Sequence, residues 1–173
     1  MFVYSILPAT TADTEALVQV VNSAYRGQGS KKGWTTEADL LDGIRTSSTA
    51  MHAMLTQEAA TVLKAIAPDG SIHGCVYLRQ EAQHLYLGML TVQPNLQGAG
   101  LGKQLLAAAE ALATQYALPV IQMSVITVRQ ELIDWYRRHG YQDTGERIPF
   151  PNDPAFGLAK QPLEFMVLRK QLS

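Results

Sequence analysis

VQPNLQGAGLGKQLL, residues 92–106, is the most informative segment of this chain. Three glycines, Gly98, Gly100 and Gly102, fall within five positions, and an apolar pattern with helical spacing follows them. Glycines lack a Cβ atom, so backbone N–H groups can approach an anion closely, and the start of a helix offers free N–H groups and a positive dipole end. The segment therefore predicts a turn from a strand into a helix that holds a phosphate group.

Two well-known phosphate motifs do not fit this segment. A P-loop requires G-x-x-x-x-G-K-[ST]. Gly102 and Lys103 supply its G-K pair, but Gln97 replaces the first glycine and Gln104 replaces the hydroxyl residue. A dinucleotide fingerprint requires G-x-G-x-x-G after a first strand, whereas the spacing here is G-x-G-x-G, late in the chain. A pyrophosphate site of another kind remains, beside the alternative of a plain turn whose glycines serve packing.

The composition indicates one globular domain over residues 1–173, with 47% hydrophobic residues and a formal net charge of −1. This charge does not favour nucleic acid or an anionic membrane as a partner. A single cysteine, Cys75, excludes an intrachain disulfide and a cysteine metal cluster, and we expect no metal site. No signal peptide and no run of about 20 apolar residues is present, so we expect a soluble, cytoplasmic protein without a membrane partner.

Apolar periodicity and turn residues predict an α/β domain with the order β-αα-βββ-α-β-α-ββ. A Pro-Asp-Gly turn at 68–70 joins the second and third strands into a hairpin. The predicted strands cover residues 2–7, 60–67, 71–80, 84–92, 118–126, 141–147 and 162–170. The predicted helices cover residues 10–27, 35–46, about 101–115 and 129–140, and the ambiguous segment 50–57 favours a further short helix.

The glycine segment resembles the signature of the GNAT superfamily of N-acetyltransferases, whose core reads Q/R-x-x-G-x-G/A. Gln97, Gly100 and Gly102 match this core, and the lead-in from Val92 to Pro94 is typical of it. The resemblance covers nearly the whole chain and is strongest in residues 86–142. It implies an α/β fold with a mixed central sheet of about six to seven strands, flanked by about four helices.

A second similarity to the same family lies in SVITVRQELIDWYRRHGYQDTGE, residues 124–146. The family pattern there is N-x-x-A-x-x-x-Y-x-x-x-G-F/Y, and Tyr136, Gly140 and Tyr141 match it. Arg129 and Leu132 stand where Asn and Ala are common. Two motifs at the right separation are more specific than either motif alone.

The resemblance implies acetyl-CoA as co-substrate and transfer of its acetyl group to an amine. Backbone amides of the glycine turn would hold the CoA pyrophosphate, and main-chain groups of the strand before it would hold the pantetheine arm. That strand, 84–92, would splay from 118–126, with a bulge near Gly88. Arg129 departs from the family residue that usually contacts the pantetheine arm, and we expect it to reach a CoA phosphate instead. The predicted cofactor-binding residues are Leu90, Val92, Gln97, Gly98, Ala99, Gly100, Leu101, Gly102, Lys103 and Arg129.

For catalysis, the resemblance assigns Tyr136 as the general acid that protonates the departing thiolate; the alternative is an aromatic residue that only packs in the core. The general base is not identified. Tyr86 stands where many members carry Glu, and Glu81, His84 and Glu37 are each more typical of solvated surface groups. An ordered water chain is the remaining alternative.

In this family, the segment between the first two helices and the late hairpin loop usually frame the acceptor. Tyr25, Trp34 and Glu37 are therefore the predicted substrate-binding residues, with a small-molecule or amino-acid-like amine as the acceptor. Trp34 plugging the edge of the core is the alternative for that residue. A non-catalytic CoA-binding module is the alternative for the whole chain. Homodimers are common in the family, but no apolar stripe in the sequence requires one.

Overall fold

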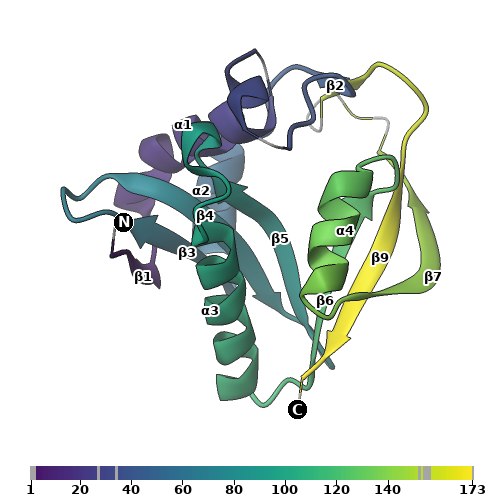
Figure 1. Ribbon diagram of the computed structural model, residues 1–173. Helices are drawn as coiled ribbons and strands as arrows, with labels where there is room; N and C mark the ends of the chain where they lie inside the picture. The colour runs from purple at the N-terminus through teal and green to yellow at the C-terminus, as the bar shows by residue number, and fades with distance from the viewer. Residues whose placement is uncertain (1–2, 27, 34, 152, 154–156, 173) are drawn as a thin grey trace.

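The computed structural model describes residues 3–26, 28–33, 35–151, 153 and 157–172. Its main feature is a seven-stranded sheet between two pairs of helices (Figure 1). Helices α1 (Thr14–Tyr25) and α2 (Ser48–Thr56) cover one face, and α3 (Leu101–Gln115) and α4 (Gln130–Arg138) cover the other. None of the helices in these described ranges is long and apolar enough to cross a membrane.

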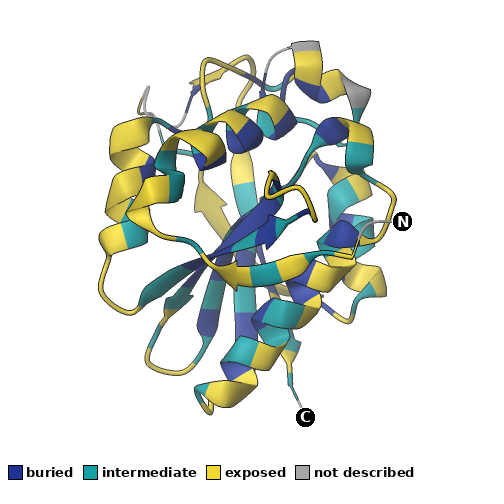
Figure 2. Cartoon of the chain, turned by 90° about the vertical axis from the view of Figure 1, so that its left-hand side faces the viewer, coloured by how far each residue is buried: buried dark blue, intermediate teal, exposed yellow. Residues whose placement is uncertain are grey.

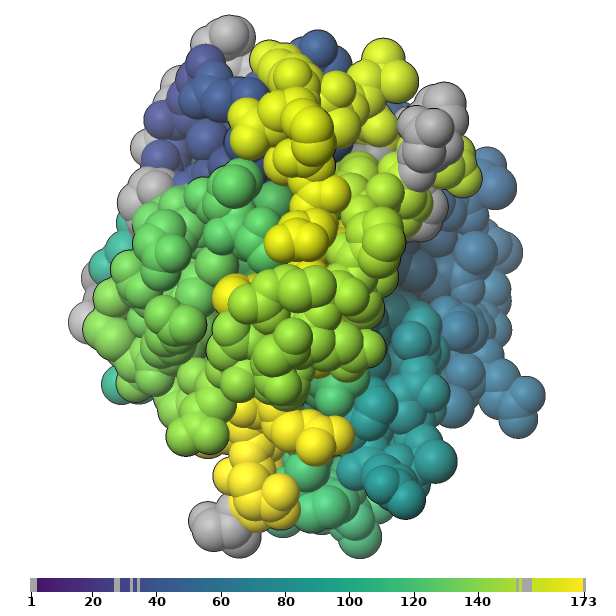
Figure 3. Space-filling model, turned by 90° about the vertical axis from the view of Figure 1, so that its right-hand side faces the viewer, coloured from purple at the N-terminus to yellow at the C-terminus, as the bar shows by residue number. Residues whose placement is uncertain are grey.

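The strands of this sheet follow the order β1-β3-β4-β5-β6-β9-β7. Neighbouring strands are antiparallel, except β5 and β6, which are parallel. Figure 3 shows the side where α4, in green, and β7, in yellow-green, cover much of the surface beside the C-terminal strand β9. The mixed sheet predicted from the resemblance is confirmed. Its strands are β1 (Ser5–Pro8), β3 (Ala60–Ile66), β4 (Ile72–Gln80), β5 (Leu85–Val92), β6 (Val120–Ile126), β9 (Glu164–Gln171) and β7 (Gln142–Pro149).

The core consists of two apolar clusters, one on each face of the sheet. Leu17, Val20 and Val21 of α1 are buried at the i, i+3, i+4 spacing that the sequence predicted. Figure 2 shows the same principle on the other helices, whose inner sides are buried and whose outer sides are exposed. The helices are therefore held by their apolar faces, and the sheet separates the two clusters.

Strand β5 carries a β-bulge in its second half. The β4–β5 ladder pairs Tyr77 with Gly88, and the next pair lies two residues earlier on β4 but three residues later on β5. Met89 and Leu90 therefore oppose a single residue of β4, and Met89 adopts a φ of 54°. The bulge that the sequence predicted near Gly88 lies immediately after that glycine.

This bulge reverses the face of the sheet to which the β5 side chains after Gly88 point. Leu87 packs in the cluster under α3 and α4, and Met89 packs in the cluster under α1 and α2. Leu90 then returns to the α3 and α4 side. Without the extra residue, strict alternation would place Leu90 on the opposite face.

Strands β5 and β6 pair only at their beginning, at Leu85 with Ile121 and Tyr86 with Gln122. Beyond Tyr86 the two strands diverge, as Figure 1 shows, so the predicted splay is confirmed. The main-chain groups along this edge of β5 are consequently not used by a β6 ladder.

The predicted helix over residues 35–46 is wrong. The segment forms turns and a short strand, β2 (Leu41–Asp42), which pairs with β8 (Leu158–Ala159). Gly43 follows with a φ of 91°, which lies outside the helical region. By contrast, the short helix favoured for residues 50–57 is confirmed as part of α2. The Ser47 hydroxyl caps this helix by accepting from the Ala50 N–H at 3.1 Å. The remaining predicted elements match the structure within a few residues.

Candidate active site

Two cavities meet where β5 and β6 diverge. We call the first the glycine-turn cavity, of about 250 Å³, because residues of the turn before α3 line it. The second, of about 290 Å³, is the arginine cavity, which Arg26, Arg45 and Arg129 line. The residues that line both cavities form their shared wall: Tyr25, Leu90, Arg129, Leu132 and Tyr136.

The glycine turn leaves open space and free amides at the start of α3. Gly98 and Gly100 have φ values of 86° and 92°, and a Cβ atom on either would meet no other atom within 4 Å. Gly100 is the N-cap of α3 and provides no side-chain cap, and the first N–H groups of a helix have no intrahelical acceptor. The side-chain amide of Gln97 donates to the Val92 carbonyl at 3.1 Å and connects the turn to β5. These features fit the phosphate groups of CoA.

Helix α4 forms the opposite side of the glycine-turn cavity. Trp135 approaches the turn so closely that a Cβ on Gly102 would lie 3.5 Å from its ring. The Trp135 ring packs against the ring of His139, with centroids 4.3 Å apart. Trp135 and His139 are not among the predicted site residues, although their i, i+4 spacing beside Tyr136 places them near one helix face.

Tyr25 and Tyr136 are the phenols of the shared wall. The Tyr25 hydroxyl donates to the Leu90 carbonyl at 2.6 Å, and burial raises the pKa of Tyr25 to about 12. Tyr136 is only 4% exposed, and among the described residues its hydroxyl has no hydrogen-bond partner. Burial raises the pKa of Tyr136 well above its ordinary value. Both side chains therefore remain protonated at neutral pH.

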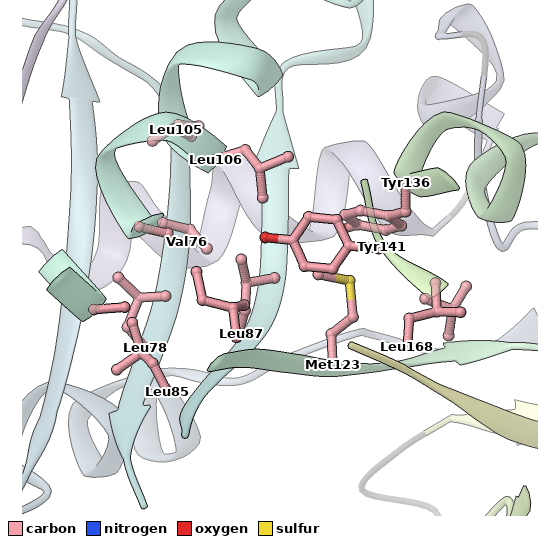
Figure 4. Close-up of a cluster of buried hydrophobic side chains, with 14 of the residues drawn as sticks. Val76, Leu78, Leu85, Leu87, Leu105, Leu106, Met123, Tyr136, Tyr141 and Leu168 are labelled. Carbon is pink, nitrogen blue, oxygen red and sulfur yellow. The ribbon is translucent and has the colours of Figure 1, made fainter. Parts of the chain in front are cut away.

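The ring of Tyr136 is fixed by aromatic neighbours. Figure 4 shows it behind Tyr141 in the apolar cluster, and their ring centroids are 5.8 Å apart. Trp135, the preceding residue of α4, packs edge-on against the Tyr136 ring, with the ring centroids 5.1 Å apart. Tyr136 thus packs in the core and also lines both cavities, and its role as general acid stays a prediction.

Glu37 joins two arginines in a buried ion cluster. Its Oε1 accepts from Arg26 Nε at 2.9 Å, and its Oε2 accepts from Arg129 Nη1 at 3.1 Å. Arg129 Nη2 also donates to Thr35 Oγ1 at 2.6 Å. Burial lowers the pKa of Arg26, and the Glu37 carboxylate opposes that shift. The predicted substrate residue Glu37 therefore lies in the arginine cavity with both carboxylate oxygens already bonded.

The structure brings together most of the predicted cofactor residues. Ala99 and Leu101 do not line the glycine-turn cavity, since Ala99 is exposed and Leu101 packs in the core. The predicted residues that do line it are Leu90, Val92, Gln97, Gly98, Gly100, Gly102, Lys103 and Arg129. That Arg129 contacts a phosphate stays a prediction, because its guanidinium already donates to Glu37 and Thr35.

The predicted acceptor residues are only partly described. Tyr25 lies in the shared wall, and Trp34 lies outside the described residues.

Of the candidates for the general base, Glu81 pairs with Arg79 at 2.5 Å outside both cavities, and His84 lines neither cavity. Within the described ranges, no group of three His, Cys, Asp or Glu residues is placed to hold a metal ion. Arg45, which lines the arginine cavity, is not among the predicted site residues.

Solved structures with this fold include several acetyltransferases. The ribosomal-protein-S18-alanine N-acetyltransferase from Escherichia coli superposes with a TM-score of 0.73 at 13% identity, covering 99% of this chain and 95% of that chain. The PaiA N-acetyltransferase from Thermoplasma acidophilum, in complex with coenzyme A, has a TM-score of 0.73 at 18% identity over 98% and 99% of the chains. Nourseothricin acetyltransferase has a TM-score of 0.70 at 17% identity over 98% and 99%.

The TM-scores show a common fold at low sequence identity. The acceptors in the names differ, so the fold does not identify the acceptor of this chain. Comparison with curated protein sequences gives no match. The family model described as "Acetyltransferase (GNAT) domain" matches residues 35–152, which is more than half of the chain and includes the glycine turn and Tyr136. On this match, the chain belongs to the GNAT family of acetyltransferases and is an enzyme of acyl transfer.

Proposed function

We propose that this enzyme transfers an acetyl group from acetyl-CoA to the primary amine of a small molecule. The observation that carries the proposal is the shared wall, where two cavities of different character meet at Tyr136. Acetyl-CoA supplies the activated thioester from the glycine-turn cavity. The amine approaches from the arginine cavity, so that nucleophile and thioester face each other across the wall.

On this proposal, main-chain groups hold most of the cofactor. The main-chain amides from Gly98 through Lys103 bind the pyrophosphate, supported by the open space beside Gly98 and Gly100. Lys103, which is exposed at the edge of the cavity, adds a positive charge. The β5 edge at Leu90 and Val92, left without a β6 partner, binds the pantetheine arm by main-chain hydrogen bonds.

Tyr136 acts as the general acid in this proposal. Its hydroxyl donates a proton to the sulfur as the carbon–sulfur bond breaks and the carbon–nitrogen bond forms. The attacking nitrogen loses one proton to solvent, and solvent then reprotonates Tyr136, so the protons balance. A main-chain N–H near Leu90 stabilises the carbonyl oxygen as it gains negative charge.

The arginine cavity helps to keep the amine neutral. Among the described residues that line it, the only carboxylate is that of Glu37, whose two oxygens accept hydrogen bonds from Arg26 and Arg129. Neighbouring positive charges disfavour an ammonium ion and lower the pKa of a bound amine. We therefore propose that water, rather than a side-chain base, accepts the proton.

The decisive experiment compares Tyr136→Phe with Tyr141→Phe. The neighbouring Tyr141 hydroxyl is buried without a hydrogen-bond partner among the described residues, so its removal is a matched control. Thiol release from acetyl-CoA is measured with a panel of primary amines. We expect Tyr136→Phe to lower kcat by about 100-fold or more, as for loss of a general acid. Equal rates in the two variants would remove the role of Tyr136.

The second candidate is a non-catalytic CoA-binding module. Arg129 and Leu132 replace the residues common in the family, and Tyr86 replaces a frequent Glu, which motivates this alternative. It predicts that CoA raises the melting temperature while no amine accelerates thiol release. Amine-dependent release by the wild-type enzyme excludes it.

A further inference from the structure

The arginine cavity contains more positive than negative charge. Among its described lining residues, three guanidiniums face one carboxylate, a formal excess of two positive charges. Glu37 cannot attract a cationic substrate, because Arg26 and Arg129 already bind its two oxygens. The cavity is therefore suited to an anion and unsuited to a second cation.

Arg45 is the member of this set that has no internal counter-ion. Its side chain forms no hydrogen bond or ion pair with any described residue, although it is half-buried. Its guanidinium carbon lies 5.3 Å from the centre of the Tyr25 ring, a cation–π arrangement. A guanidinium carries five N–H donors, and here they are available to a ligand.

The backbone at Arg45 is fixed. The N–H groups of Arg45 and Thr46 both donate to Asn22 Oδ1 of α1, at 2.8 and 3.0 Å. The Asn22 amide returns a hydrogen bond to the Thr46 carbonyl at 3.0 Å. The segment is thus attached to α1, and Tyr25 of the same helix supports the Arg45 side chain. A preorganised guanidinium loses less entropy when it binds an oxyanion.

We propose that Arg45 binds a carboxylate of the acceptor, so that the substrate class is a small amine that also carries a carboxylate, such as an amino acid. This inference rests on the proposed function and deepens it. Arg45 lines only the arginine cavity, whereas Tyr136 and Leu90 belong to the shared wall. The amine therefore lies at the wall, and the carboxylate points towards Arg45.

The remaining wall of the cavity fits an apolar side chain of such an acceptor. Phe150 and Phe165 stack with their ring centroids 5.2 Å apart, and Ile148 lies beside them in the lining. A planar carboxylate can accept two parallel hydrogen bonds from the guanidinium of Arg45, which fixes its orientation as well as its position.

The test uses pairs of acceptors that differ only in the carboxylate. Alanine is compared with alaninamide and phenylalanine with phenylalaninamide, by thiol release from acetyl-CoA. A charged hydrogen bond is worth about 1.5–3 kcal/mol, so we expect kcat/KM to favour each acid by at least about tenfold. The amide has the less basic amine and is chemically favoured at neutral pH, which makes a preference for the acid diagnostic.

Variants of Arg45 assign this preference to its guanidinium. In Arg45→Gln the ratio of acid to amide should fall towards one, mainly through a higher KM for the acid. Arg45→Lys should retain part of the ratio, because it retains the charge. Arg138→Gln, on the exposed side of α4, serves as the control and should leave the ratio unchanged. A wild-type ratio near one, or a ratio that survives Arg45→Gln, would overturn the inference.

A direct binding measurement covers the case in which none of the four acceptors reacts. N-acetylalanine and N-acetylphenylalanine are added to the CoA-loaded protein, and the melting temperature is recorded. A rise in the wild type that is absent in Arg45→Gln supports the inference, and no rise in the wild type overturns it. Stabilisation by acetyl-CoA alone, measured in parallel, tests the cofactor part of the proposed function separately.

Discussion

The two cavities are built in opposite ways. The glycine-turn cavity takes much of its lining from one contiguous segment, residues 90–103, whose main chain and missing Cβ atoms create the space. The arginine cavity takes its lining from side chains far apart in the chain, and Glu37 and Arg129 are separated by 92 positions. A cofactor shared by a whole family can be held by main-chain geometry, whereas an individual acceptor requires specific side chains. Substitutions in the glycine-turn cavity should therefore affect cofactor binding. Substitutions in the arginine cavity should affect the stability of the fold and the choice of acceptor.

The largest effect is expected from Glu37→Gln, which removes the buried carboxylate that Arg26 and Arg129 share. Breaking a buried ion cluster costs about 3–5 kcal/mol, which at about 2–4 °C per kcal/mol lowers the melting temperature by roughly 6–20 °C. Glu131→Gln is the control, because its side chain is 44% exposed and lies 3.9 Å from Arg129 Nε. We expect Glu131→Gln to lower the free energy of unfolding by less than about 1 kcal/mol. Equal decreases of the melting temperature in the two variants would show that the buried ion cluster stabilises the fold no more than the exposed ion pair does.

The next effect tests the glycine-turn cavity through Gly100→Ala. A left-handed φ costs a residue with a Cβ roughly 1–2 kcal/mol, and the new methyl group also enters the space assigned to the pyrophosphate. Gly70→Ala is the matched control, since Gly70 has a φ of 89° and open space but lies in the β3–β4 turn. Similar losses of stability are expected in a denaturation experiment. Only Gly100→Ala should weaken acetyl-CoA binding, by about tenfold, in calorimetry. A comparable loss of affinity for acetyl-CoA in both variants would show that the glycine turn does not bind the cofactor.

A smaller effect is expected at the shared wall from Tyr25→Phe, which removes the hydrogen bond to the Leu90 carbonyl. One such bond contributes about 0.5–1.5 kcal/mol, so we expect up to about a tenfold loss in kcat/KM. Tyr77→Phe is the control, because it removes a hydrogen bond to Gln57 outside both cavities. The two variants should lose similar stability, but steady-state kinetics should distinguish them. If Tyr77→Phe slows turnover as much, the tyrosine at the wall has no specific function.

The smallest effect is expected from Lys103→Gln. The side chain is exposed at the edge of the glycine-turn cavity, where water and salt screen its charge. We expect the KM for acetyl-CoA to rise by only about two- to threefold, and the difference to disappear at high salt. A large increase that persists in salt would mean that a side chain, rather than the main chain, dominates phosphate binding.

The same contrast explains what the sequence predicted. The glycine turn, the two motifs and the helix periodicities are local, so the order of elements and the position of the cofactor cavity followed from short stretches. The turn at Gly43 was missed because Leu40, Leu41 and Ile44 are compatible with a helical pattern, and β2 is stabilised by a partner strand more than 100 residues away.

The arginine cavity was not predictable from local patterns. Glu37 and Tyr25 were assigned to the acceptor site by family resemblance. The pairing of Glu37 with Arg26 and Arg129, and the contact of Tyr25 with Arg129, depend on how the end of α1 and the start of α4 meet. The bulge at Met89 and Leu90 also changes which face each residue points to, and alternation alone cannot show this. Arg45 carried no sequence signal, because only the fold brings it beside Tyr25.

A crystal structure of this enzyme with CoA would test the central claim most directly. We predict that the pyrophosphate contacts the amides of residues 98–103 and that the CoA sulfur lies within about 3–4 Å of the Tyr136 hydroxyl, as a proton donor requires. The sulfur would then face the arginine cavity across the shared wall. A pyrophosphate bound elsewhere, or a sulfur separated from Tyr136 by other side chains, would contradict the assignment of both cavities.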